Sequence, residues 1–251
     1  MIKLLTPDAV ELVRKNMDEL DPNGSMLYDT ENGSASEYGD NQSLDDIVER
    51  NLPEAINAVN LAAPVQLLEG KEHLFEAGSV SINAADGVMT INLGADDNYL
   101  RLVAFQAADS AIVVTDTLAE ASAEGRKQLN PYIRGRADRP RLVIRQGKHS
   151  GPVLKYYSLS LPVSINYYRD GAVVCDEHDK PEAIEQFSYV QEQSYPGEHF
   201  LTPSHQYVYG YYISRRIRQN IIDYLTAVVL EVYGDQRAQT FYQKANQFPK
   251  I

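Results

Sequence analysis

Four short stretches of the sequence carry side chains that could perform chemistry, and each also has a plainer structural interpretation. Residues 176–179 (DEHD) offer carboxylate oxygens and an imidazole nitrogen, which are common metal ligands. Adjacent ligands on one loop rarely converge on a single ion, and no second element supplies partners at a matching spacing. We therefore expect a solvated acidic turn at these residues and no metal site.

The other three stretches could hold acid–base or nucleophilic groups. Asp96 and Asp97 could act as paired carboxylates, but the surrounding run GADDN favours a turn that they shape. Cys175 stands near His178, yet a lone thiol at the end of a strand is more often a packing residue than a nucleophile. Residues 147–151 (GKHSG) place the serine one position too late for G-x-S-x-G, between segments with the pattern of strands. We expect a hairpin connection there.

Longer enzyme motifs are missing from the sequence. It contains no H-E-x-x-H, G-x-G-x-x-G or G-x-x-x-x-G-K-[ST]. We therefore predict that the protein is not an enzyme, has no catalytic residue and binds no cofactor. A small enzyme remains an alternative, which a screen for bound metal or cofactor would expose.

Charge is distributed unevenly along the chain. Lys and Arg total 23 and Asp and Glu total 35, for a net charge of −12. Residues 1–100 carry 5 basic and 19 acidic side chains, whereas residues 126–148 carry 8 basic and 1 acidic. The first segment is therefore net −14 and the second net +7, and such complementary patches can meet within the fold, between copies or on a partner.

Arginines dominate this basic stretch. The predicted contact residues are five of its six arginines, namely Arg134, Arg136, Arg139, Arg141 and Arg145. Guanidinium groups pair in bidentate fashion with carboxylates and with phosphates alike, so the residue type does not distinguish the two partners. Because the rest of the chain is acidic, we expect contact with protein, either in a neighbouring copy or in another partner, and keep DNA as the alternative.

Composition indicates a soluble chain with a buried core. Of 251 residues, 43% are hydrophobic, and no run approaches the ~20 apolar residues of a membrane span. The opening MIKLLTPDAVELVRK meets charge too early for a secretory signal, so we expect synthesis in the cytoplasm and no membrane contact. A single cysteine excludes an internal disulfide framework.

The expected elements follow the order helices, strands, helices. Residues 1–75 have helical apolar spacing around a polar loop at 21–43. In residues 76–204 the apolar period changes to two, between Gly, Pro, Asn and Asp. From 205 to 251 the helical spacing returns. We therefore predict an α+β fold, in which a helical bundle from the N- and C-terminal helices carries a central antiparallel β-sheet insertion.

The two terminal apolar stripes are expected to share one core, because neither can remain exposed to water. The predicted core residues are Ile47, Val48, Ala55 and Val59 in the N-terminal part and Ile217, Ile221, Leu225 and Val228 in the C-terminal part.

Several stretches resemble one known family. Residues 44–68 (LDDIVERNLPEAINAVNLAAPVQLL) have the pattern of a helix with a Leu-Pro-Glu-Ala passage and an Ala-Pro-Val exit. Residues 91–105 (INLGADDNYLRLVAF) combine a strand, an acidic turn and Tyr-Leu-Arg-Leu-Val, and residues 211–248 end in LEVYGDQRAQTFYQKANQF. In these stretches the chain resembles the head-to-tail connector (adaptor or ring) proteins of tailed bacteriophages, in the version found in crAss-like phages.

The resemblance implies a structural role without catalytic residues. It implies a homo-oligomeric ring, usually of twelve copies, located in the virion between the portal protein and other tail or ring proteins. Genomic double-stranded DNA would pass through its lumen without sequence-specific contact. The alternative is a nucleic-acid or regulatory binding module that uses residues 126–148, and its DNA affinity would depend strongly on salt.

Overall fold

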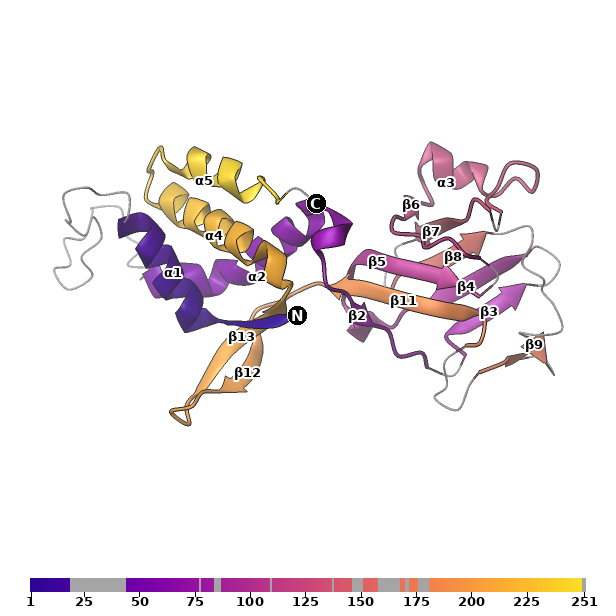
Figure 1. Ribbon diagram of the computed structural model, residues 1–251, viewed down its shortest axis with the longest axis horizontal. Helices are drawn as coiled ribbons and strands as arrows, with labels where there is room; N and C mark the ends of the chain where they lie inside the picture. Colours follow the sequence, from indigo (N-terminus) through magenta and orange to yellow (C-terminus); the bar gives the residue numbers. More distant parts are fainter. Residues whose placement is uncertain are drawn as a thin grey trace. The chain divides into compact units, whose positions relative to one another are not determined.

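A computed structural model shows two compact units in the chain (Figure 1). It describes residues 1–18, 44–76, 78–83, 87–108, 110–136, 138–145, 151–157, 168–169, 172–175 and 181–249. Unit 1 combines both ends of the chain, Met1–Glu69 and Gln193–Ile251, and unit 2 is the middle part, Gly70–Glu192. The expected polar loop at 21–43 lies outside the described residues.

Four helices of unit 1 pack on one another. They are α1 (Thr6–Asp18), α2 (Leu44–Ala62), α4 (Arg218–Val232) and α5 (Ala238–Ala245). Helix α4 contacts each of the other three, so it is the central helix of this unit. Nine residues of α4 are buried, and their distribution around the helix matches contacts on several sides.

Unit 1 also contains a sheet of its own, in the order β1-β13-β12. Strand β1 (Ile2–Leu5) pairs antiparallel with β13 (Tyr207–Ile213), and β13 pairs antiparallel with β12 (Glu198–Leu201). Two short 3₁₀ turns, η2 (Val65–Leu67) and η4 (Arg215–Ile217), complete the unit. The sheet therefore joins the two ends of the chain directly.

Unit 2 is built mainly from two sheets. The first has the order β3-β4-β8-β7-β6 and comprises β3 (Val80–Asn83), β4 (Val88–Asn92), β6 (Leu118–Ala119), β7 (Arg141–Arg145) and β8 (Val153–Tyr157). The second has the order β2-β11-β5 and comprises β2 (Lys71–Glu72), β5 (Tyr99–Ala107) and β11 (Ile184–Gln191). The remaining elements are η3 (Ala95–Asp97), α3 (Ala123–Lys127) and the pair β9 (Tyr168–Arg169) and β10 (Ala172–Val173).

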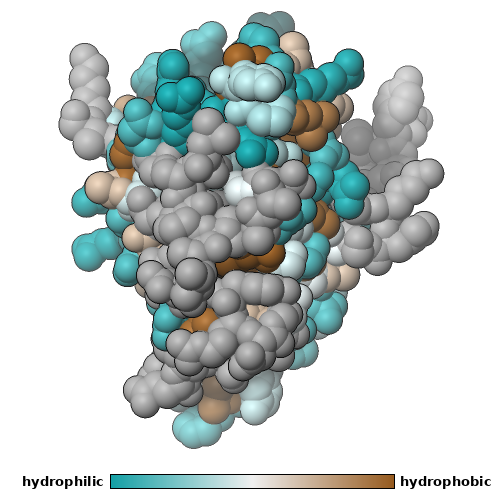
Figure 2. All heavy atoms as spheres, turned by 90° about the vertical axis from the view of Figure 1, so that its right-hand side faces the viewer, coloured by the Kyte–Doolittle hydropathy of each residue, from teal (hydrophilic) through white to brown (hydrophobic). Residues whose placement is uncertain are grey.

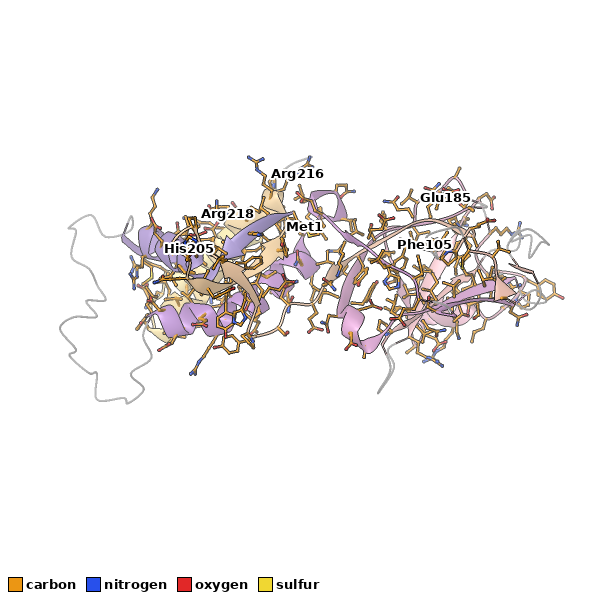
Figure 3. All side chains as sticks on the ribbon, turned by 90° about the horizontal axis from the view of Figure 1, so that it is seen from below. Met1, Phe105, Glu185, His205, Arg216 and Arg218 are labelled. Carbon is orange, nitrogen blue, oxygen red and sulfur yellow. The ribbon has the colours of Figure 1, made fainter. Side chains whose placement is uncertain are left out.

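The two larger sheets of unit 2 share one hydrophobic core. Phe105 of β5, labelled in Figure 3, lies 5.2 Å from Tyr156 of β8 and 6.1 Å from Phe187 of β11, measured between ring centroids. Each of these rings is almost fully buried. These strands are rich in aromatic and β-branched residues, which favour extended backbone in a packed sheet.

The predicted fold class is wrong. In the described part of the chain, strands outnumber helices by thirteen to five, and no bundle of N- and C-terminal helices frames the sheets of unit 2. The terminal helices instead pack in a separate unit that has its own three-stranded sheet. The central insertion is also not one antiparallel sheet, because β6 and β7 pair in parallel and β2, β5 and β11 form a second sheet.

The error has a local cause. Residues 207–213 (YVYGYYI) were expected in the C-terminal helices, but they form strand β13. Aromatic and β-branched residues favour extended backbone when a partner strand is present. The partner is β1, a four-residue segment at the other end of the sequence, and periodicity within one segment carries no information on such a distant pairing.

Candidate functional site

The basic stretch 126–148 lies in unit 2 and, as far as it is described, runs from the end of helix α3 through strand β7. Of the five arginines predicted to make contacts, Arg134 is half-buried and the other four are exposed. Arg136 and Arg139 share one turn, because their backbones exchange hydrogen bonds of 3.1 and 2.8 Å. The turn therefore carries two exposed arginines whose backbones pair with each other.

Most of these arginines have no acidic partner among the residues that the structure describes. Arg145 approaches Glu120, with 3.9 Å between the guanidinium Nε and the carboxylate, but Lys155 lies closer to the same carboxylate at 2.9 Å. No ion pair within the described ranges includes Arg134, Arg136 or Arg139. This surface is therefore available for an acidic or phosphate-bearing partner.

Beside the arginines, three large apolar side chains are exposed on an ordered turn. Residues 129–133 (LNPYI), which we call the apolar turn, place Tyr132 at 86% exposure, Leu129 at 61% and Ile133 at 57%. Figure 2 shows hydrophobic residues reaching the surface beside hydrophilic ones at the upper end of its view. This feature is absent from the expectations based on the sequence, although three apolar residues inside a basic stretch were a signal for it.

The apolar turn is held from within. The backbone carbonyl of Asn130 accepts hydrogen bonds from the amides of Ile133 (3.2 Å) and Arg134 (3.1 Å), and its side-chain oxygen accepts one from Tyr132 (3.0 Å). At the base of the turn, the buried side chain of Gln128 accepts a hydrogen bond from the amide of Gly135 at 2.8 Å. The apolar side chains are thus presented by a defined backbone.

Unit 1 contains a cavity with acidic side chains, which we call the acidic cavity. Its volume is about 560 Å³. It is lined by Thr6, Pro7, Val10, Glu11 and Arg14 of α1, Asp45 and Glu49 of α2, and Val208 and Tyr209 of β13. Arg14 pairs with Asp45 at 2.8 Å, and Glu49 accepts a hydrogen bond from Tyr195 at 3.4 Å. The lining therefore combines apolar walls with an excess of carboxylates.

The predicted core residues of the terminal segments all lie in α2, η4 or α4 of unit 1. Seven are buried, namely Ile47, Val48, Ala55, Val59, Ile217, Ile221 and Leu225, and Val228 is half-buried. The structure brings the two groups together, because α2 and α4 pack against each other.

A buried contact between His73 and Asp97 in unit 2 was also missed in the sequence. The ring of His73 is buried, and its Nδ1 lies 3.5 Å from a carboxylate oxygen of Asp97. Burial lowers the pKa of His73, while Asp97 and Glu76 raise it to a lesser extent. Tyr189 donates a hydrogen bond to the backbone carbonyl of Asp97 at 3.1 Å. His73 is buried, and Asp97 also accepts a hydrogen bond from the amide of Gly94 in its own turn. The contact between His73 and Asp97 therefore favours a structural role for both residues.

The other chemical candidates remain apart. Asp97 accepts a hydrogen bond from the amide of Gly94 at 2.7 Å and so shapes the turn that contains η3. Cys175 is exposed, whereas a packing role was expected. Residues 176–179 and 146–150 lie outside the described residues, and with them His178. Within the described ranges, no three His, Cys, Asp or Glu side chains gather closely enough to hold a metal ion.

Comparison with models of protein families, with curated proteins and with solved structures finds no match for this chain. Among the helices that the structure describes, none combines the length and apolar character needed to cross a bilayer.

Proposed function

We propose that the chain is a structural subunit of a homo-oligomeric ring at the head-to-tail junction of a tailed bacteriophage. The observation that carries this proposal is the exposed, ordered apolar turn beside arginines that lack acidic partners among the described residues. A protein that presents such a surface on a net-acidic chain is suited to contact between protein subunits. The resemblance of residues 44–68, 91–105 and 211–248 to phage connector proteins supplies the location.

In this role the protein contributes interfaces. A ring requires a heterologous contact, in which one surface of a copy meets a different surface of the next, and it closes when the rotation between copies completes a circle. In the proposed assembly the portal protein and other tail or ring proteins contact its two faces, and genomic double-stranded DNA passes through the lumen. The number of copies, twelve in the family that the chain resembles, is part of the proposal.

A nucleic-acid binding module is the second candidate, and one observation favours it. Tyr132 stands exposed in a stretch rich in exposed arginines, and aromatic rings beside guanidinium groups can bind unpaired bases and phosphates. This function predicts an affinity for single-stranded DNA that falls steeply with salt. The net charge of −12 opposes it, because the rest of the chain repels the phosphate backbone.

A double charge reversal separates the two candidates. In the ring, Arg136→Glu with Arg139→Glu should reduce assembly, measured as particle mass and as closed rings in electron micrographs, while circular dichroism shows a folded subunit. Arg50→Glu with Arg218→Glu makes the same change in net charge at exposed positions of unit 1 and serves as the control. For the binding module, the first pair should instead weaken DNA binding and flatten its salt dependence. Single copies in purified connector complexes would refute the ring.

A further inference from the structure

We propose that the apolar turn of one copy docks into the acidic cavity of a second copy of this chain. The proposal rests on the proposed function, because a homo-oligomer places these two surfaces on neighbouring copies. It specifies which parts of the subunit form the heterologous contact: residues 129–133 of unit 2 on one side, and the cavity formed by α1, α2 and β13 of unit 1 on the other.

The turn is preorganised for binding. Tyr132, Leu129 and Ile133 are each more than half exposed, although the hydrogen bonds of Asn130 and Gln128 fix the backbone that carries them. Exposed apolar side chains lose solvent contact favourably when a partner covers them. Because the backbone is already ordered, little backbone conformational entropy remains to be lost on binding. Tyr132 also has the amphipathic character of side chains that are enriched at interfaces.

The acidic cavity offers a matching environment. The apolar part of its wall consists of Pro7, Val10 and Val208. Its volume of about 560 Å³ lies within the range of ligand-binding cavities, roughly 300–1,000 Å³. The cavity is therefore large enough to receive an aromatic ring and an adjacent aliphatic side chain.

Charge complementarity selects the occupant. Glu11 and Glu49 line the cavity, and neither belongs to an ion pair with another described residue. The apolar turn is followed directly by Arg134 and Arg136, so docking would bring guanidinium groups to the acidic rim. An acidic cavity repels phosphate, which excludes nucleic acid as its occupant and favours a basic protein segment. Among the described segments, the basic stretch with its apolar turn combines both properties.

Disulfide trapping between two different copies tests the contact. In a Cys175→Ser background, one protein carries Tyr132→Cys and the other carries Glu11→Cys, so each has a single thiol and a disulfide can form only between molecules. Glu11 and Tyr132 are both exposed. After the two proteins are mixed and mildly oxidised, we expect at least about fivefold more heterodimer than from Tyr132→Cys mixed with Gln243→Cys, which is an exposed position on α5.

A charge exchange gives a second readout that does not depend on cysteine. Glu11→Lys with Glu49→Lys should reduce assembly to a similar extent as Arg136→Glu with Arg139→Glu. Mixing the two charge-reversed proteins should restore association, because each again meets an opposite charge. A generally destabilised subunit would show no such rescue, so the mixture distinguishes a broken contact from a broken fold.

The outcomes separate this contact from the ring itself. Closed rings without enrichment of the disulfide between Tyr132→Cys and Glu11→Cys would overturn the docking and leave the proposed function standing. Enrichment of that disulfide in dimers or open chains that never close would support the docking and refute the ring. If the disulfide is no more frequent than in the control and charge exchange gives no rescue, the acidic cavity does not receive the apolar turn.

Discussion

Replacement of Leu225 by Ala measures how far the core of unit 1 depends on helix α4. The side chain of Leu225 is fully buried, and α4 is packed against α1, α2 and α5. The substitution removes about three carbon atoms, and at ~0.8 kcal/mol per buried methylene their transfer to water accounts for roughly 2.4 kcal/mol. With helices on several sides the site collapses poorly, so a residual cavity adds about 1 kcal/mol, and we expect a total loss of about 3–4 kcal/mol.

Urea unfolding followed by far-UV circular dichroism is the appropriate assay, because four of the five described helices belong to unit 1. The matched control is Val232→Ala on the same helix, where the side chain is 57% exposed and the expected change is within ~0.5 kcal/mol. A loss below about 1 kcal/mol for Leu225→Ala, with an unchanged denaturant dependence, would refute the assignment of Leu225 to a tightly packed core.

Two further predictions concern unit 2. Gly135→Ala should destabilise it by about 1–3 kcal/mol, because the new Cβ would lie 2.7 Å from the carbonyl oxygen of Tyr157. Gly94→Ala is the control, since its Cβ meets only ordinary contacts, and equal unfolding midpoints of the two variants would contradict the prediction. The second prediction concerns His73. Burial of this side chain lowers its pKa below 6.5. Below the pKa of a free histidine, the unfolded chain therefore binds more protons than the folded chain, so the unfolding free energy should fall as the pH drops from about 7 to about 5. His73→Phe should weaken this pH dependence. If the pH profile of the variant is unaltered, the contribution of His73 is refuted.

The sequence was most informative where burial follows from a local pattern. The apolar spacing of residues such as Ile47, Val59 and Leu225 identified side chains that the structure buries, because a helical face that repeats every three or four residues must be covered. The same pattern does not name the covering element. The sheet that joins β1 to β13 was therefore missed, and with it the correct fold class.

The proposed interaction surface was predictable only in part. Charge counting located the basic stretch, since net charge is a sum over sequence. The exposure of Tyr132 depends on the hydrogen bonds that Asn130 accepts within the turn. The acidic cavity depends on α1, α2 and β13, and more than 150 residues separate α1 from β13. Neither arrangement is encoded in a short motif. The same holds for the approach of His73 to Asp97, which adjacent strands and turns bring together.

The division of unit 1 between the two ends of the chain has a consequence for biosynthesis. Helix α2 ends at Ala62, whereas its partner α4 is complete only at Val232. Ribosomes add roughly 5–20 residues per second, so about 10–30 s pass between these two events. Unit 2 is finished within that interval, while the apolar faces of α1 and α2 still lack their partner. Nascent chains thus expose these apolar faces for several seconds, and transiently exposed hydrophobic surface favours aggregation.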